Sequence, residues 1–287
     1  MITSKIGAHV SIAGGIWNAP QRAASAGCEV MQIFTRSPQG GAAPALTPEI
    51  IERFVAARAE FGMSDVYIHT PYYINLGSEK PQTVASSIRI IREELERGSM
   101  LGARYVMTHI GSAAEQDRSV VIRRVGESFA AILNDYAGST QLLIEISAGA
   151  GSVLGCTFAE ISQIMEYGNL KRLEGFGGIC FDTCHAFASG YDYRSLDGLH
   201  KMLEEFDREI GLDLLKLTHV NDSKGACGDR KDRHDHIGLG QIGRDAMSHI
   251  LSSTAFAKIN WILETPEERR LEDVQTLRTI RDTCGGI

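Results

Sequence analysis

Acidic and histidine residues follow a short apolar run in the stretch 178–192 of this chain. Asp182 comes directly after residues 179–181, Ile-Cys-Phe, and His185 follows three residues later, in the loop expected after this strand. The Asp182 carboxylate can supply an oxygen ligand to a metal ion, and the His185 imidazole a nitrogen ligand. A simpler interpretation is that Asp182 caps the next helix and His185 is hydrogen-bonded in the core. The rest of the chain has to distinguish between the two.

The same arrangement recurs along the chain. Each of seven apolar runs ends in a histidine or an acidic residue, and the polar segment 221–243 adds more. A single histidine in such a place is usually a core residue. Residues converging from seven strand ends would crowd carboxylates and imidazoles together, and buried carboxylates without partners are costly, so metal ions are the expected compensation. Besides Asp182 and His185, the residues are His9, His69, His109, Glu145, His219, Glu264, Asp232 and His234, with His236 close by.

Carboxylate oxygens and imidazole nitrogens suit Zn²⁺, with Mn²⁺ and Fe²⁺ as competitors. Nine ligands drawn from this set exceed the four of a tetrahedral zinc site, so they predict two or three ions with at least one shared carboxylate. Cys180 and Cys184 lie beside Asp182 and are further candidates. For these two cysteines, small buried hydrophobic side chains are the simpler interpretation.

Eight short β-like runs position these residues, and longer helical patterns separate them. Eight strands that alternate with helices predict an α/β protein, a (β/α)₈ TIM barrel that forms one domain over residues 1–287. Its metal site would lie at the C-terminal rim, where such barrels carry their chemistry. An open doubly wound sheet is the alternative, but no G-x-G-x-x-G loop follows the first run. The expected strands are residues 5–10, 29–35, 66–70, 105–110, 142–146, 178–183, 215–220 and 259–265.

The expected helices have recognisable ends. Thr47 and Pro48 form a start signal, and Thr157 with Glu160 forms a capping box. The segment 221–243 is polar, rich in glycine and too long for a simple connection, which is typical of a functional loop. The helices are expected at residues 48–61, 81–100, 119–133, 158–167, 199–210 and 267–280.

The composition narrows the class of protein. The 287 residues are 43% hydrophobic and 23% charged, without a long apolar segment, so we expect neither secretion nor a membrane. Six cysteines without a C-x-x-C pair favour reduced thiols in the cytoplasm. The net charge of −7 argues against nucleic acid bound through a basic surface. Three zinc ions would offset six of those charges at one site.

The motifs closely resemble the endonuclease IV family of apurinic/apyrimidinic endonucleases. The resemblance runs from IGAHVSIAGG at residues 6–15 to ILETP at residues 262–266 and covers nearly the whole chain. Its most specific parts are GICFDTCHAFASGYD, and HVNDSK followed by DRHDHIGLGQIG. It implies a barrel with three zinc ions, for which Mn²⁺ is a possible substitute. The first ion would be held by His69, His109 and Glu145, the second by Glu145, Asp182, His219 and Glu264, and the third by His185, Asp232 and His234.

The resemblance also implies a reaction. The substrate would be double-stranded DNA with an abasic site, hydrolysed on its 5′ side in base excision repair to leave a 3′-hydroxyl and a 5′-deoxyribose phosphate. A hydroxide bridging two metals would attack phosphorus, with Glu145 and Glu264 as the catalytic residues that orient it. Binding would bend the duplex and turn out the abasic nucleotide. We expect a monomer.

The chain departs from the family pattern where DNA is bound. Gln39 and Gly41 stand where many members carry Arg-x-Trp, and Tyr73 follows Tyr72 where a leucine is common. We expect Arg36, Gln39 and the two tyrosines to contact DNA, since tyrosine can stack on bases. The segments HIGS and EISAG replace the family's HPGS and ENTAG but keep the ligands. These changes affect the expected affinity for abasic sites rather than the hydrolytic chemistry.

Two other functions fit parts of the pattern. A metal-dependent sugar isomerase or epimerase can use the same kind of barrel and the same ligand types. Such enzymes generally use one or two metals, so the Asp232-x-His234 pair argues against this alternative. The second alternative is a protein that binds damaged DNA without cutting it. A complete set of metal ligands argues against it, because such a metal cluster has no evident use in binding alone.

Overall fold

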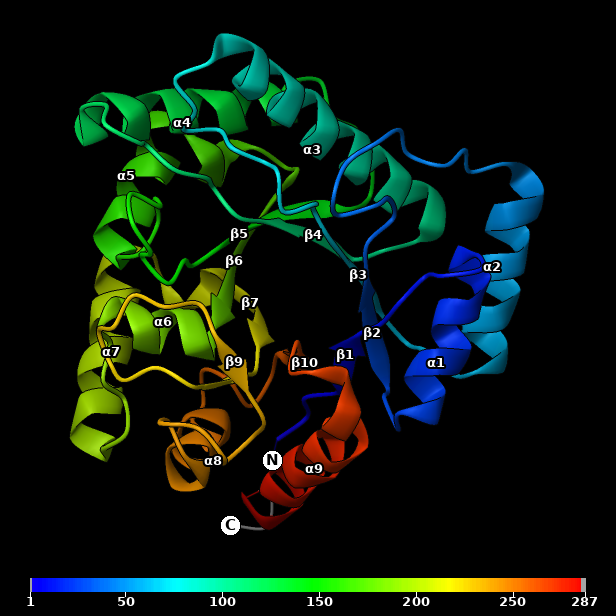
Figure 1. The fold of residues 1–287 in the computed structure, drawn as a ribbon, viewed down its shortest axis with the longest axis vertical. Coiled ribbons are helices and arrows are strands. Elements are labelled where there is room, and N and C mark those ends of the chain that lie inside the picture. The colour runs from blue at the N-terminus through cyan, green and yellow to red at the C-terminus, as the bar shows by residue number, and fades with distance from the viewer. Residues whose placement is uncertain (1, 285–287) are drawn as a thin grey trace.

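The computed structural model describes residues 2–284 and arranges eight parallel strands in a closed barrel (Figure 1). Parallel pairing of β1 with β10 joins the two ends of the chain and closes the barrel. The strand order is β1-β10-β7-β6-β5-β4-β3-β2, which confirms the predicted fold and all eight predicted strands. The strands are β1 Ile6–His9, β2 Val30–Ile33, β3 Val66–His69, β4 Tyr105–Thr108, β5 Gln141–Glu145, β6 Phe176–Asp182, β7 Leu215–His219 and β10 Asn260–Leu263.

Helices surround the barrel (Figure 1). The sequence predicted six of them, but not α1, α6 or α8. The predicted loop 221–243 contains a small antiparallel pair, β8 (Asp222–Ser223) with β9 (His234–Asp235). Within residues 2–284, no helix is both long enough and apolar enough to cross a membrane. The helices are α1 Ala19–Ser25, α2 Pro48–Glu60, α3 Pro81–Leu101, α4 Arg118–Leu133, α5 Phe158–Tyr167, α6 Thr183–Ser189, α7 Leu196–Glu209, α8 Arg244–Ser252 and α9 Arg270–Cys284.

The start signals for α2 and α5 act as predicted at their first residues. The Thr47 hydroxyl accepts a hydrogen bond from the Ile50 N–H at 3.4 Å, and the Thr157 hydroxyl accepts one from the Glu160 N–H at 3.2 Å. The reciprocal half of the capping box differs from the prediction. The Glu160 carboxylate instead pairs with Arg118 at the start of α4, so it ties two neighbouring helices together.

The alternating direction of side chains along each strand gives the barrel two cores. The larger core packs the strands against the helices. The smaller core fills the barrel interior. Two residues after each inward-facing residue of a strand, the side chain points inward again. In six strands that next inward residue is a predicted ligand, as in Tyr67 followed by His69. The interior residues are Val30, Tyr67, Tyr105, Met107, Leu143, Cys180, Leu217 and Ile262.

Candidate metal centre

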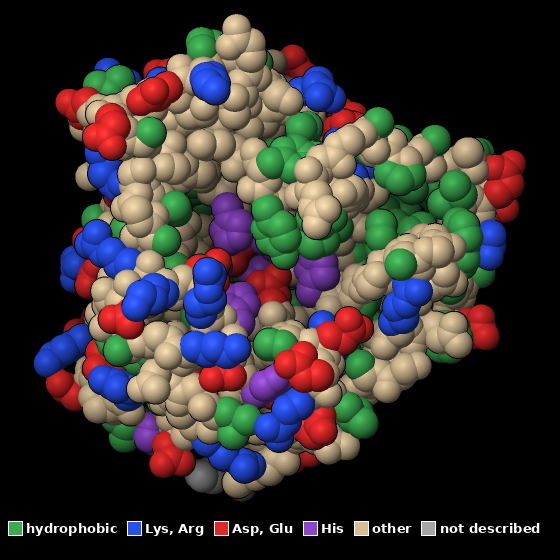
Figure 2. All heavy atoms as spheres, viewed as in Figure 1, with side chains coloured by type: hydrophobic (Ala, Val, Ile, Leu, Met, Phe, Trp, Pro, Cys, Tyr) green, Lys and Arg blue, Asp and Glu red, His purple; other side chains and the backbone are tan. Residues whose placement is uncertain are grey.

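A hollow opens at the C-terminal ends of the strands, and histidines with carboxylates form its floor (Figure 2). Its volume is about 520 Å³. Arg233, an exposed cation of the segment 221–243, contributes to its lining. The lining includes His9, His69, His109, His185, Asp232, His234, Glu264, Tyr72, Arg233 and Arg270.

The first ligand group joins β3, β4 and β5. His69 Nε2 lies 3.0 Å from Glu145 Oε2, and His109 Nδ1 lies 3.8 Å from the same oxygen. One candidate ligand atom from each residue falls within 4.8 Å of the others. Glu145 and His69 are almost completely buried, and this arrangement suits a small ion held by two nitrogens and one oxygen.

The second group uses the other oxygen of Glu145. His219 Nδ1 lies 2.9 Å from Glu145 Oε1, 3.3 Å from Glu264 Oε2 and 3.9 Å from Asp182 Oδ2. Glu145 therefore faces the first group with Oε2 and the second with Oε1. A carboxylate in this position can bridge two cations. The structure brings Glu145, Asp182, His219 and Glu264 together, and Glu145 also belongs to the first group.

The third group comes from α6 and from the segment around β9. His185 Nε2 and His234 Nε2 each lie 3.2 Å from Asp232 Oδ1. Both nitrogens are buried, and neither has an aligned hydrogen-bond partner among the described residues. Buried polar atoms without partners are costly, so these two nitrogens and the facing oxygen fit a cation between them.

Asp182 caps a helix and also lies in one of the candidate ligand groups. Its Oδ1 accepts a hydrogen bond from the His185 N–H at 2.7 Å and so caps α6. Its Oδ2 belongs to the second group, near His219. The expectation that His185 lies in a loop was wrong, since it occupies the first turn of α6. This hydrogen bond fixes the spacing between Asp182 of the second group and His185 of the third.

Main-chain carbonyls orient three of the site histidines. The Nδ1 atoms of His69, His185 and His234 face the carbonyl oxygens of Thr70, Ile146 and Glu264, at 2.6, 3.0 and 3.3 Å respectively. An imidazole that donates from Nδ1 keeps its Nε2 lone pair free for a metal. All three rings therefore present Nε2 to their groups.

Charge in the hollow is balanced between imidazoles and carboxylates. Burial disfavours the charged form of His234, but the facing carboxylate of Asp232 and the charge of Asp182 outweigh it and raise the pKa of His234 to about 9. Burial also disfavours the charged form of His185, but Asp182 and Asp232 outweigh this effect and raise its pKa well above the ordinary value. Burial likewise disfavours the charged form of Glu145, but nearby histidines outweigh it and lower the pKa of this carboxyl. Protons and metal ions are alternative partners for these carboxylates, so metal binding has to release protons.

Neither cysteine near the site favours coordination. Burial raises the pKa of the Cys180 and Cys184 thiols to about 12, whereas a metal ligand has to be a thiolate. Cys180 packs in the barrel interior. Cys184 Sγ lies within reach of Asp182 and His234, but those two residues also belong to the groups above. Imidazole and carboxylate ligands therefore remain the better set.

The four predicted DNA-binding residues differ in exposure, and two of them, Tyr72 and Tyr73, line the cavities at the ligand groups. Tyr72 is 68% exposed and Tyr73 36% exposed, on the segment after β3. Gln39 is exposed, whereas Arg36 is buried and paired with Glu94 and Glu93. A DNA contact by Arg36 would require that pairing to change. Contacts by all four residues stay predictions.

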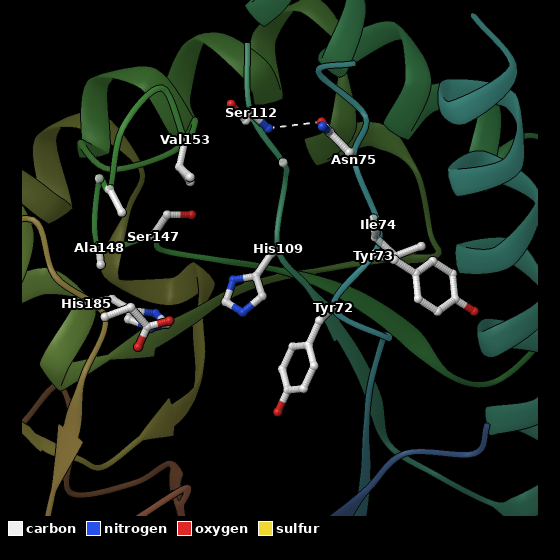
Figure 3. Close-up of a pocket in the computed structure, with 14 residues that line it drawn as sticks. Tyr72, Tyr73, Ile74, Asn75, His109, Ser112, Ser147, Ala148, Val153 and His185 are labelled. Atoms are coloured by element: carbon white, nitrogen blue, oxygen red, sulfur yellow. Dashed lines mark hydrogen bonds and ion pairs between the residues drawn. The ribbon is translucent and has the colours of Figure 1, made fainter. Parts of the chain in front are cut away.

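A second cavity of about 510 Å³ adjoins the hollow and shares its wall (Figure 3). In that view the ring of His109 lies between His185 and Tyr72. The Ser147 hydroxyl lines this cavity and has no hydrogen-bond partner among the described residues. The two cavities together leave room beside the ligand groups for more than a single phosphate.

Gln32, which was not predicted from the sequence, is buried in β2 and contacts two of the ligands. It lies two residues after Val30, but only the structure shows that Val30 faces the barrel interior. His9, by contrast, was singled out but joins none of the ligand groups. Its Nδ1 lies 3.0 Å from Gln32 Nε2.

The fold and the site place the chain in a known class of barrel. It matches the xylose isomerase-like TIM barrel family over residues 20–282. The crystal structure of endonuclease IV from Thermus thermophilus superposes with a TM-score of 0.84 at 32% identity, covering 99% of this chain and 100% of that one. A D-tagatose 3-epimerase-like protein, with a TM-score of 0.74 but 18% identity, shares the fold alone.

Relatives in sequence define the family further. Proteins described as probable endonuclease 4 from Geotalea daltonii and Halothermothrix orenii are 41% and 35% identical to this chain. Each alignment covers 96% of this chain, and 97% and 99% of the respective relatives. The chain therefore belongs to the endonuclease IV family of apurinic/apyrimidinic endonucleases. This confirms the expectation of a hydrolase of the DNA-repair nuclease class.

Proposed function

We propose that the protein hydrolyses the phosphodiester on the 5′ side of an abasic site in duplex DNA. The products would be a 3′-hydroxyl and a 5′-deoxyribose phosphate, as base excision repair requires. The observation that carries this proposal is Glu145, whose two oxygens face two separate ligand groups at 3.0 and 2.9 Å. A shared carboxylate between two cations is the arrangement of enzymes that displace groups at phosphorus in line.

The proposed cofactors are three zinc ions per chain, with Mn²⁺ as a possible substitute. The three groups described above would hold one ion each, and Glu145 would serve two of them. The ligand set of imidazole and carboxylate, with unpartnered nitrogens on His185 and His234, supports zinc. When bound, zinc lowers the pKa of water so that it is nucleophilic at neutral pH, and it neutralises charge on a phosphate.

The chain's own residues would orient the substrate and the nucleophile. Glu145 and Glu264 both face the second group, and their carboxylates can accept hydrogen bonds from an attacking water and fix its direction. Tyr72 and Tyr73 project beside the hollow, where a flat ring can replace the stacking that is lost when an abasic nucleotide leaves the duplex. Extrusion costs least where a base is already missing, which supports abasic DNA as the substrate.

A sugar isomerase or epimerase is less well supported. The likeness to a tagatose epimerase-like protein is at 18% identity and concerns the fold. The third group, formed by His185, Asp232 and His234, also exceeds the needs of a sugar-binding site with one or two metals.

The proposal also covers how the chain acts. All nine candidate ligands come from one chain, which supports a monomer as the active unit and residues 1–287 as one domain. The five cysteines whose side chains are described are free thiols, which supports a reducing compartment such as the cytoplasm.

The decisive experiment is incision of a duplex that contains a tetrahydrofuran abasic analogue by zinc-loaded protein. We expect cleavage 5′ to the analogue, a fragment that a polymerase can extend from its 3′-hydroxyl, and no cleavage of an undamaged duplex. Glu264→Gln should lower turnover at least about 100-fold while changing DNA affinity much less, because the lost carboxylate acts on the reaction. Absence of incision by protein confirmed to hold three metals would overturn the proposal, and equal losses of turnover and affinity would overturn the role of Glu264.

A further inference from the structure

Gln32 is a completely buried polar residue at the centre of the ligand groups. It lies on β2, and its side chain points into the barrel toward β7 and the end of β10. Its Oε1 lies 2.7 Å from His219 Nε2. Its Nε2 lies 2.6 Å from Glu264 Oε1 and 3.0 Å from His9 Nδ1. One amide thus contacts two residues of the second group, although it belongs to none of the groups itself.

Only one orientation of the Gln32 amide pairs each donor with an acceptor. The NH₂ group has two protons, and the Glu264 carboxylate and the bare nitrogen of His9 accept them. The reversed amide would place its carbonyl oxygen against the Glu264 carboxylate, where no proton is available. The carbonyl therefore faces His219 and accepts a proton from Nε2, which leaves Nδ1 of His219 free on the side of Glu145 and Asp182.

The acceptor that faces His219 Nε2 is a side-chain carbonyl, whereas main-chain carbonyls hold the rings of His69 and His185. A carbonyl of the barrel backbone is present whatever the side chains are, so His69 and His185 keep their ring orientation through most substitutions. On the side of Nε2, away from its group, the His219 ring is held by one replaceable side chain instead, that of Gln32. His219 also presents Nδ1, rather than Nε2, to its group.

We propose that Gln32 is the positioning residue of the second metal group. It selects the tautomer of His219 that leaves Nδ1 available, and it holds Oε1 of Glu264 so that Oε2 faces the group. The inference rests on the proposed function only in taking this group as a metal site. Partners that orient metal ligands typically change metal affinity by about 10- to 100-fold when they are removed.

The test compares the wild type with Gln32→Met and Gln32→Glu. Methionine has a similar length but neither donates nor accepts as the amide does, whereas glutamate keeps an acceptor for His219 and repels Glu264. Zinc affinity is measured by competition with a chromophoric chelator, and the His219 tautomer by ¹⁵N NMR of zinc-loaded protein. Thr218→Val is the matched control, because Thr218 neighbours His219 in β7, is buried, and its hydroxyl has no partner among the described residues.

We expect Gln32→Met to release one class of zinc about 10- to 100-fold more readily and to lose the Nε2–H tautomer of His219. Gln32→Glu should keep the tautomer but also weaken that zinc, and Thr218→Val should change neither. Wild-type zinc affinity and tautomer in a folded Gln32→Met protein would overturn the inference. If that variant does not fold, unchanged zinc affinity in Gln32→Glu would overturn it instead. If the variants show these zinc effects but zinc-loaded wild-type protein does not cut abasic DNA, only the proposed function would be refuted.

Discussion

The charge of each residue in the hollow depends on its immediate partner, and His234 shows this most directly. Its Nε2 lies 3.2 Å from Asp232 Oδ1 and 3.8 Å from Asp182 Oδ2. These carboxylates overcome the effect of burial and raise the pKa of His234 to about 9. A folded-state pKa above the ordinary value of 6.5 means that the protonated ring stabilises the folded protein. That contribution is complete below pH 6.5 and is lost as the pH rises through about 9.

We therefore predict that chelator-treated protein loses stability between pH 6.5 and pH 9. The loss should be about 1–3 kcal/mol in the free energy of unfolding, measured by urea denaturation at several pH values. His234→Gln should flatten this dependence, because glutamine does not titrate. Zinc-loaded protein should show the opposite trend, since metal binding requires deprotonated ligands and strengthens as the pH rises. A stability that is flat over this range, or that rises with pH, in the chelated wild type would contradict the assignment.

The elements of the barrel were predictable to different degrees. Its strands are buried apolar runs, and their alternation alone carries the polar end residues to one rim. Helix α6 was missed because its seven residues follow β6 without a break, so that the helix begins directly after the strand residue Asp182 that caps it. Gln32 was missed because the inward face of β2 becomes evident only when its neighbours are known. Only the family resemblance could assign the ligands to separate groups, because the sequence of one strand does not give its distance from the end of another.

One carboxylate organises the segment that carries the third group. Asp222 is completely buried, and its oxygens accept hydrogen bonds from the N–H groups of Gly238, Ile242 and Gly243 at 3.0, 2.9 and 3.2 Å. These bonds join the two ends of the segment 221–243 to each other. Asp232 projects from the same segment and depends on its shape.

We predict that Asp222→Asn destabilises the protein by about 2–4 kcal/mol, because an amide nitrogen would face backbone donors and leave buried groups unpaired. The variant should also bind the ion of the third group more weakly than the other two. Urea unfolding and zinc content after dialysis measure both effects. Asp245→Asn, an exposed change at the start of α8, is the control and should cost less than about 1 kcal/mol. Equal zinc retention in Asp222→Asn and wild type would show that the segment does not need this anchor.

On the scale of the whole molecule, the charge is unevenly distributed. The chain carries a formal net charge of −7, and four carboxylates lie in the ligand groups, on Glu145, Asp182, Asp232 and Glu264. Basic residues lie along one edge of the same hollow (Figure 2). In the segment 221–243 the exposed ones are Lys224, Arg230, Lys231 and Arg233. A DNA phosphate thus meets cations at the edge and carboxylates at the centre, and bound divalent ions would change the sign of the centre.

We therefore predict that removing the metals weakens binding even to undamaged duplex, which is not cut. Chelated protein should bind at least about 10-fold more weakly than zinc-loaded protein at the same salt concentration, because uncompensated carboxylates repel phosphates. Fluorescence anisotropy over a salt series measures this, and returning zinc should restore the affinity. Lys231→Gln should lower the affinity of the zinc-loaded protein and reduce the salt dependence by about one ion. Equal affinity with and without metal would mean that DNA is held by the basic segment alone, and that the metal centre acts only after binding.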